Sequence, residues 1–236
     1  MLVKNEIDII KLNIDYHLLL IDHLFVMDNC STDGTYEYLK TLSEKVTVLT
    51  IASDMYDQKL WVTRMVNYAI NLGADWVINL DADEFLVGNI RKVIEDAHIA
   101  GYNQIYPKGL MFRSTINDDV QIKNPIERMT HRDTYSAKYD YDKVIFNVSN
   151  FSMMVQGNHW VTLFTGVNAN ILRTTDLKIF HYSDRNCDQF KRKYTVQCDS
   201  SRVTQMGHIW KQRNDIFISQ GEQGLEEFYQ KEILFA

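Results

Sequence analysis

The first hundred positions of the chain alternate between short apolar runs, typical of strands, and longer stretches whose apolar residues recur at helical spacing. The strand-like runs are Met1–Val3, Leu24–Met27, Val46–Ile51 and Trp76–Leu80. The helix-like stretches are Ile7–Leu20, the segment that ends at Leu42, Lys59–Leu72 and Ile90–Ala100. Strands that alternate with helices in this way predict a parallel sheet joined by right-handed crossovers.

The pattern changes after position 100 to short runs of aromatic and β-branched residues, which favour mixed or antiparallel strands. These runs lie around Ile105, Met111, Val144–Phe146, Trp160–Val161 and Ile179–Phe180. A helical tail follows, with helices expected near Cys187–Val196 and Gly224–Ile233. We therefore predict an α/β protein with a mostly parallel central sheet flanked by helices, a small antiparallel extension and C-terminal helices.

Composition narrows the classes of protein. The 236 residues are 45% hydrophobic and 12% aromatic, which is enough for a sizeable core in one continuous domain. Residues 1–100 hold 8 Lys and Arg against 16 Asp and Glu, and residues 101–236 hold 17 against 15. The acidic front half argues against a nucleic-acid partner, because binding a phosphate backbone needs clustered positive charge.

Cysteine usage and hydropathy bear on the compartment. Three cysteines without a CxxC pair favour a reducing compartment, so the cytoplasm is expected. No apolar run approaches the roughly 20 residues that span a bilayer, and the start lacks the order of a signal peptide. We expect any contact with the membrane to be peripheral.

The chemistry is expected at the end of the fourth strand, where Asp81, Asp83 and Glu84 crowd into four positions. Adjacent carboxylates repel one another, and a hard divalent cation with oxygen ligands is the usual remedy. The other polar clusters also follow predicted strands, at the edge where ligands collect in open parallel sheets. These clusters are Lys4–Glu6, Asp28–Gly34 and Ser53–Asp54, and we expect them to converge with the acidic segment.

Five elements of the sequence, between about residues 3 and 193, together resemble nucleotide-sugar glycosyltransferases of the GT-A type, in their family 2-like branch. They are Val3–Glu6, the Asp-Asn-x-Ser-x-Asp-Gly-Thr run of Asp28–Thr35, Asp81–Phe85, Gly157–His159, and His181–Ser183 followed by Gln189–Lys191. The resemblance implies a GT-A, Rossmann-like fold in a single continuous domain. Within it, residues 1–100 would form the nucleotide-sugar-binding half and residues 101–236 the acceptor-side half.

The resemblance also implies a bound Mn²⁺ or Mg²⁺ that neutralises the departing diphosphate. Asp83 is expected to be a direct ligand. Asp81 is assigned to the metal site and to the donor, facing the ribose or a metal-bound water, and His181 would complete the site from the far side. Imidazole suits Mn²⁺ better than Mg²⁺. His159 competes for the role of His181, or contacts the acceptor or the diphosphate.

The nucleotide is expected to contact residues of the first strands. Lys4 and Glu6 line the end of the first strand, and Arg64 with Asn67 resembles the family's Arg-x-x-Asn element. Asp28 lies where such enzymes place a carboxylate against the nucleobase. An aspartate can accept the imide hydrogen of uracil or thymine, which favours a uridine donor.

For several of these residues a structural interpretation stays open. The side chains of Asp28, Asn29, Ser31 and Asp33 could instead be turn formers with local backbone bonds. Lys143 would either steady the diphosphate or lie at a solvated strand edge.

Inverting transfer needs a general base for the acceptor hydroxyl, and no clean copy of the family's acidic element is visible. The candidates are Glu84, Asp118, Asp119, Glu127, Asp140 and Asp142, of which Glu84 and Asp119 join Asp83 in the predicted catalytic set.

Two further groups are open to more than one interpretation. Lys191–Lys193 with Arg185 forms either a solvated helix face or a basic patch for an anionic lipid surface or a lipid-linked pyrophosphate. The aromatic residues either stack on sugar rings or belong to the core. They are Tyr135, Tyr139, Tyr141, Trp160 and Trp210.

The sequence thus predicts metal-dependent transfer of a sugar from a nucleotide diphosphate, with a UDP-sugar favoured. The acceptor would be a hydroxyl of a glycan or lipid-linked glycan, in the cytoplasm or at the inner face of the membrane. The enzymatic alternative is a metal-dependent nucleotidyltransferase or phosphohydrolase, although Lys4–Glu6 lacks the Gly-rich basic loop of a nucleotidyltransferase. The other alternative is a catalytically silent, carbohydrate-binding relative.

Overall fold

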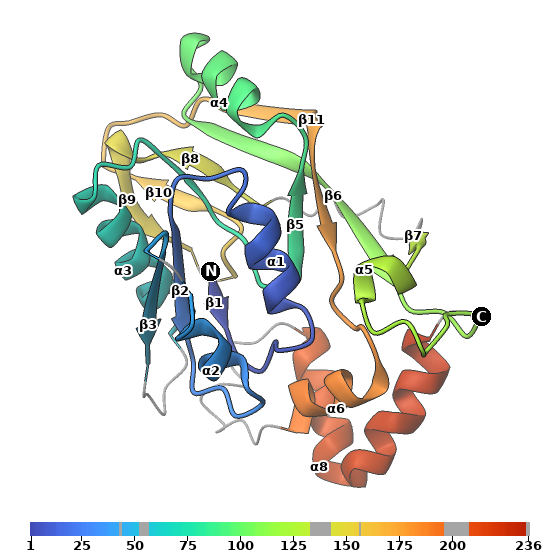
Figure 1. The fold of residues 1–236 in the computed structure, drawn as a ribbon. Coiled ribbons are helices and arrows are strands. Elements are labelled where there is room, and N and C mark those ends of the chain that lie inside the picture. Colours follow the sequence, from blue (N-terminus) through green and yellow to red (C-terminus); the bar gives the residue numbers. More distant parts are fainter. Residues whose placement is uncertain (43, 52–56, 133–142, 156, 196–207, 235–236) are drawn as a thin grey trace. The chain divides into compact units, whose positions relative to one another are not determined.

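The computed structural model describes residues 1–42, 44–51, 57–132, 143–155, 157–195 and 208–234 (Figure 1). Several sequence predictions concern residues outside these ranges, namely Ser53, Asp54, Tyr135, Tyr139, Asp140, Tyr141, Asp142 and Cys198, and the side chain of Trp210 also lies outside the description. The chain forms two compact units. One holds the described residues within 1–52, 57–110 and 134–181, and the other those within 111–133 and 182–236.

The first unit begins with the predicted parallel sheet. Strands β1 (Leu2–Val3), β2 (Leu24–Asp28) and β3 (Val46–Thr50) lie side by side in that order, and both pairs are parallel. The helices between them and after them are α1 (Ile10–His17), α2 (Thr35–Leu39) and α3 (Gln58–Asn71). Residues of β1, α1 and β2 share one core cluster, which includes Val3, Ile10 and Val26.

A second, mixed sheet has strands in the order β4–β8–β6–β11–β5, with β7 (His131–Arg132) paired to β6 off this path. Figure 1 shows β8, β6, β11 and β5 of this sheet. The bounds along the path are β4 (Trp76–Ile78), β5 (Glu84–Val87), β6 (Gln104–Arg113), β8 (Ile145–Asn147) and β11 (Ile171–His181). The fourth predicted strand therefore differs from expectation. It ends at Ile78 and pairs antiparallel with β8, where apolar Ile78 meets Ile145.

Strand β5 places the acidic segment beside β11. It begins at Glu84, where the sequence predicted only the turn after the fourth strand, and it pairs antiparallel with β11. Gly88 ends this strand with φ +133°, and a Cβ there would lie 2.4 Å from the carbonyl oxygen of Asp176. Only glycine fits so close an approach of two backbones. Helix α4 (Ile90–Ile99) follows, and the side chain of Asn89 accepts the Lys92 N–H at its start.

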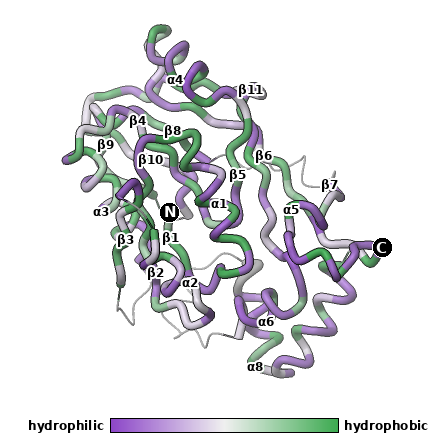
Figure 2. Tube along the Cα trace, in the orientation of Figure 1, coloured by the Kyte–Doolittle hydropathy of each residue, from purple (hydrophilic) through white to green (hydrophobic). Residues whose placement is uncertain are grey.

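A small antiparallel pair, β9 (Phe151–Met154) and β10 (Val161–Leu163), follows a short 3-10 turn, η2 (Val148–Asn150), and matches the predicted extension. The core of the mixed sheet contains Leu86, Ile105, Ile145, Leu177 and Ile179. Figure 2 shows hydrophobic and hydrophilic positions alternating along helix α4, whose apolar side packs on this core.

The second unit is mainly helical. It contains α5 (Pro125–Arg128), β7 (His131–Arg132) paired with the end of β6, α6 (Cys187–Thr195), α8 (His208–Phe228) and the π-helical turn η3 (Tyr229–Ile233). Its core joins α6 to α8 and η3 through Phe190, Leu225 and Tyr229. The predicted helical tail is thus present. Among the helices in the described ranges, none has the length and apolar character to cross a bilayer.

Candidate active site

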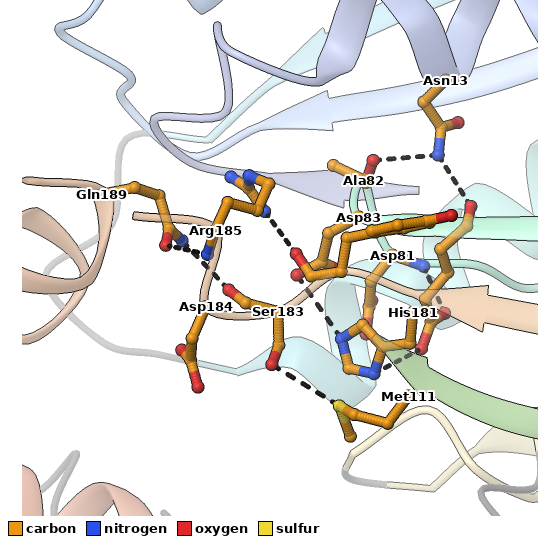
Figure 3. Close-up of polar contacts among 12 residues, drawn as sticks. Asn13, Asp81, Ala82, Asp83, Met111, His181, Ser183, Asp184, Arg185 and Gln189 are labelled. Atoms are coloured by element: carbon orange, nitrogen blue, oxygen red, sulfur yellow. Dashed lines mark hydrogen bonds and ion pairs between the residues drawn. The ribbon is translucent and has the colours of Figure 1, made fainter. Parts of the chain in front are cut away.

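The acidic segment after β4 is held in place by helix α1. The Asn13 side-chain amide donates to the backbone oxygen of Ala82 at 2.9 Å and to that of Glu84 at 2.7 Å (Figure 3). Ala82 itself belongs to the core cluster of β1 and β2. The backbone around Asp83 is therefore fixed from both sides before any ligand binds.

His17, one turn further along α1, completes this attachment. The Leu86 N–H donates to His17 Nε2 at 3.2 Å, so Nε2 is the unprotonated nitrogen and Nδ1 carries the proton. Nδ1 lies 2.8 Å from Asn13 Oδ1 and 2.9 Å from the Asn13 carbonyl oxygen. Burial lowers the pKa of the His17 imidazole to about 4, although its hydrogen bond with the backbone of Asn13 acts in the opposite direction. The neutral imidazole is thus the form that fits the folded chain.

Asp83 and His181 face one another across the end of the β5–β11 ladder. His181 is the register partner of Glu84, next to Asp83 in the chain. His181 Nε2 lies 3.5 Å from Asp83 Oδ2, and the two residues are 9% and 6% exposed (Figure 3). His181 Nδ1 lies 4.0 Å from Glu84 Oε1. The structure thus brings Asp83 and His181 together, and their shared role as metal ligands stays a prediction.

Lys143 lies on the other side of the acidic segment, with a side chain that is 1% exposed. Its Nζ is 2.5 Å from Asp81 Oδ2 and 3.4 Å from Glu84 Oε2. Glu84 Oε2 also accepts the Asp81 N–H at 2.9 Å. The crowding of carboxylates is therefore relieved in part by an ammonium group of the chain itself. Lys143 is not at a solvated strand edge, and its predicted contact with a diphosphate stays a prediction.

Glu84 is fully buried. Burial raises the pKa of its carboxyl to about 7, and the Lys143 ammonium opposes this shift. Its Oε1 has no hydrogen-bond partner within the described part of the chain. A carboxylate in this position organises the segment, and its catalytic role stays a prediction.

The acidic segment and His181 offer oxygen and nitrogen atoms of the kinds that bind divalent cations. In the described ranges, no group of three His, Cys, Asp or Glu side chains could hold a metal ion. Two ligands in neighbouring positions of an octahedral ion with bonds of about 2.1 Å lie roughly 3 Å apart. Asp83 Oδ2 and His181 Nε2, 3.5 Å apart, come close to that spacing, so the pair would fit two positions of such an ion, and other ligands would have to complete its coordination. Asp81 is paired with Lys143, so its direct coordination stays a prediction.

The loops after β1 and β2 interlock at the carboxyl end of the parallel sheet. The Asn5 N–H donates to Ser31 Oγ at 2.9 Å, and the Thr32 N–H donates to Asn5 Oδ1 at 2.8 Å. Asp33 accepts the N–H groups of Ile7 and Thr35 at 3.1 and 3.0 Å. The side chains of Ser31 and Asp33 therefore act as turn formers that accept backbone N–H groups.

Asp28 is different from its neighbours in this loop. It ends β2, is 2% exposed, and accepts the Ser31 N–H at 3.0 Å through Oδ2. Its Oδ1 is buried and has no hydrogen-bond partner among the described residues. The described residues thus leave part of the acceptor capacity of this buried carboxylate unused.

The other residues predicted to bind nucleotide lie in the β1 loop and on α3. Lys4 and Glu6 are half-buried in the β1 loop, where the Glu6 N–H donates to Thr35 Oγ1 at 2.9 Å. Arg64 lies on the exposed side of α3, as does Asn67. The assignment of these side chains to the nucleotide stays a prediction.

The Gly157–His159 loop is attached to the strand that leads into the acidic segment. Asn79 Nδ2 donates to the Asn158 carbonyl oxygen at 2.8 Å, and the Gly157 N–H donates to Gln58 Oε1 at 3.2 Å. Asn158 itself is 1% exposed with φ +61°. His159 is half-buried and remains a predicted contact of the acceptor or diphosphate.

The candidate bases of the second unit have local structural roles. Asp118 Oδ1 accepts the Thr115 hydroxyl at 2.6 Å, Asp119 Oδ1 accepts the Gln121 N–H at 2.9 Å, and Glu127 Oε1 accepts the Asn124 amide at 2.8 Å. These bonds support turns and a helix start. The catalytic role of Asp119 stays a prediction.

The predicted basic patch needs one correction. Arg185 is 1% exposed and donates to the Tyr182 carbonyl oxygen at 3.0 Å, so it is not part of an exposed patch. Lys191 lies 3.4 Å from Glu226 and 3.7 Å from Asp188, which cancels part of the remaining charge. Among the aromatic candidates, Trp160 is 47% exposed and packs against Tyr106.

Sequence reasoning missed Asn13, His17 and Asn79. All three are buried polar residues whose side chains bond to backbone groups near the acidic segment or the Gly157–His159 loop. The one available signal was the i, i+4 spacing of Asn13 and His17 on the otherwise apolar side of α1.

No protein-family model matches the chain, and no curated protein sequence does either. Among solved structures, S. aureus TarS 1-349 in complex with UDP is similar at 11% identity and a TM-score of 0.48, covering 98% of this chain and 73% of that one. A longer S. aureus TarS structure gives 11% identity and a TM-score of 0.47 over 86% of this chain. The chain spans 40% of the length of that second structure. At this level of likeness, function has to be inferred from the chain's own residues.

Proposed function

We propose that the chain is a GT-A type, family 2-like glycosyltransferase that moves a sugar from a uridine diphosphate donor to a hydroxyl of a glycan or lipid-linked glycan. The observation that carries this proposal is the buried Asp83–His181 pair, with 3.5 Å between Oδ2 and Nε2. Asp83 lies directly before β5 and His181 is the last residue of β11, while the neighbouring Ala82 packs in the core of the parallel sheet. Ligands of open α/β sheets collect at such strand ends.

The departing diphosphate carries negative charge that has to be balanced as the sugar leaves. Asp83 and His181 would hold an Mn²⁺ or Mg²⁺ ion, which supplies Lewis-acid stabilisation of that charge. Asn13 and His17 keep the backbone of this segment rigid, so the two ligands need no rearrangement to bind. Preorganisation of this kind lowers the cost of charge development.

The preference for uridine rests on Asp28. Its unpartnered buried Oδ1 would accept the imide N–H of uracil, a hydrogen that cytosine and adenine do not offer at the equivalent ring position. Inversion, the general base and an acceptor at the membrane surface also belong to the proposal. They derive from the sequence resemblance.

The nucleotidyltransferase alternative is disfavoured by the β1 loop. Nucleotidyltransferases need free backbone N–H groups after the first strand to bind phosphates. Here the N–H groups of Asn5, Glu6 and Ile7 donate to the side chains of Ser31, Thr35 and Asp33. These donors are already used within the chain.

A thermal-shift screen of nucleoside diphosphates, with and without Mn²⁺, tests the proposal. A ligand that binds only the folded state increases the free energy of unfolding by RT ln(1 + [L]/Kd) and so raises the melting temperature. UDP is expected to do so when Mn²⁺ is present and to have little effect with EDTA. Equal shifts with and without metal, or shifts for CDP and ADP as large as for UDP, would contradict the proposal.

A further inference from the structure

A buried ammonium group from a distant part of the chain lies against the acidic segment. The Lys143 side chain is 1% exposed, lies 2.5 Å from Asp81 and 3.4 Å from Glu84, and comes from the segment just before β8. Isolated ammonium and carboxylate groups are costly to bury, and contact between them offsets that cost. The contact with Asp81 therefore offsets the cost of burying the Lys143 ammonium group, and Lys143 in turn holds the Asp81 carboxylate in position.

Two groups from other parts of the chain contact the acidic segment, and they differ in kind. Lys143 lies against Asp81 and Glu84, whereas Asp83 lies against the His181 imidazole. The Lys143 ammonium group engages the Asp81 carboxylate and makes the local electrostatic potential more positive. Both effects weaken the attraction for a second cation.

We propose that Lys143 is a positioning residue which withholds Asp81 from the metal and keeps the affinity for divalent cations low until a nucleotide diphosphate binds. This inference rests on the proposed function, because it assumes that Asp83 and His181 hold the metal. Phosphate oxygens supply the missing ligands and negative charge, so the ion binds well only together with the donor. The site then exchanges metal freely when it is empty of donor.

The first test measures Mn²⁺ affinity without nucleotide, by calorimetry and by the electron paramagnetic resonance signal of free Mn²⁺. Lys143→Met removes the charge at similar length and releases Asp81. It is expected to bind Mn²⁺ at least about tenfold more tightly than the wild type, because one unit of nearby positive charge is lost. Lys143→Arg keeps the charge and is expected to stay within about threefold of the wild type.

A matched control is Lys92→Met, which removes an exposed lysine paired with Asp96 on α4. It is expected to leave Mn²⁺ affinity unchanged. A purely structural role for Lys143 would weaken Mn²⁺ binding in Lys143→Met or leave it as it was. Either result would overturn the proposal.

The double variant Lys143→Met with Asp81→Asn restores the net charge of the segment. It is expected to return the Mn²⁺ affinity to within about threefold of the wild type, and to melt higher than Lys143→Met in EDTA, because it leaves no unpaired carboxylate at position 81. If Lys143→Met does not fold, the double variant carries the test. Failure of the double variant to fold, or loss of its Mn²⁺ binding, overturns the proposal.

The same measurements separate this inference from the proposed function. If the chain is not a metal-dependent transferase, UDP fails to promote Mn²⁺ binding in every variant, while the melting temperatures in EDTA still report whether Lys143 balances Asp81. If only the inference is wrong, UDP promotes Mn²⁺ binding in the wild type, and Lys143→Met does not tighten binding in its absence.

Discussion

His181 faces Asp83 because of strand register: the pairing of His181 with Glu84 across β11 and β5 leaves His181 Nε2 3.5 Å from Asp83 Oδ2. The two side chains come from segments far apart in the sequence, and a backbone ladder brings them together. Their separation is therefore set largely by the pairing of Glu84 with His181.

Asp83→Asn replaces a charged oxygen by a neutral amide of the same size. We expect it to abolish the Mn²⁺-dependent rise in melting temperature with UDP and to reduce sugar transfer at least about 100-fold, because a charge-stabilising group is removed. Asp176→Asn, an exposed change on β11, serves as the control. Wild-type turnover in Asp83→Asn would contradict the assignment.

His181→Gln tests the metal preference of the site. Imidazole is a better ligand for Mn²⁺ than for Mg²⁺, so the loss of affinity in the presence of UDP should be larger for Mn²⁺, about tenfold against a few-fold for Mg²⁺. Titrations with both ions measure this difference. Equal losses for the two ions would argue that the histidine acts only by packing.

Asp28→Asn tests the contact with the base. The substitution places an N–H₂ group where Oδ1 would accept the imide hydrogen, so UDP affinity is expected to fall about tenfold or more. Binding of inorganic pyrophosphate with Mn²⁺ should be unchanged, because it lacks a base. A parallel loss for pyrophosphate would indicate general damage to the loop.

Asn13→Ala should destabilise the first unit. It leaves two buried carbonyl oxygens, those of Ala82 and Glu84, without their donor, at a cost of about 2–4 kcal/mol in the free energy of unfolding. Urea denaturation measures the change. Asn67→Ala, an exposed substitution on α3, should change stability by less than about 0.5 kcal/mol.

His17 should make stability depend on pH. Its folded pKa of about 4 lies below the ordinary value of 6.5, so the unfolded chain binds the extra proton first. The contribution is therefore complete above pH 6.5 and is lost as the pH falls from 6.5 towards 4, by at most about 3 kcal/mol. Unfolding curves across this range should have a smaller slope with pH in His17→Gln than in His98→Gln, a substitution on the exposed side of α4.

The features that could be predicted from the sequence are those encoded by local patterns of residues. The order of strands and helices in the first half follows from apolar spacing, and the parallel pairing of β1, β2 and β3 follows from the helices between them. The position of Asp83 beside His181 was expected from the motifs of a family. These features are either periodic or short enough to be recognised in one segment.

The remaining features depend on pairings over long sequence separations. Nothing local shows that β4 pairs with β8, and so nothing shows that Lys143, just before β8, lies against Asp81. The crowded carboxylates predicted a bound cation. The chain itself provides a positive charge there, the ammonium group of Lys143, although a lysine is ordinarily expected at the surface. Asn13 was missed for a similar reason, because a polar residue within a helix ordinarily faces water.

The β5–β11 ladder has one more consequence. Because backbone pairing spaces Asp83 from His181, changes in the length or sequence of residues 165–167, ahead of β11, are expected to leave the pair in place. A one-residue deletion inside β11, in contrast, would turn the imidazole to the opposite face of the sheet. Engineers seeking a new substrate range can therefore graft loops around this ladder and leave its register intact.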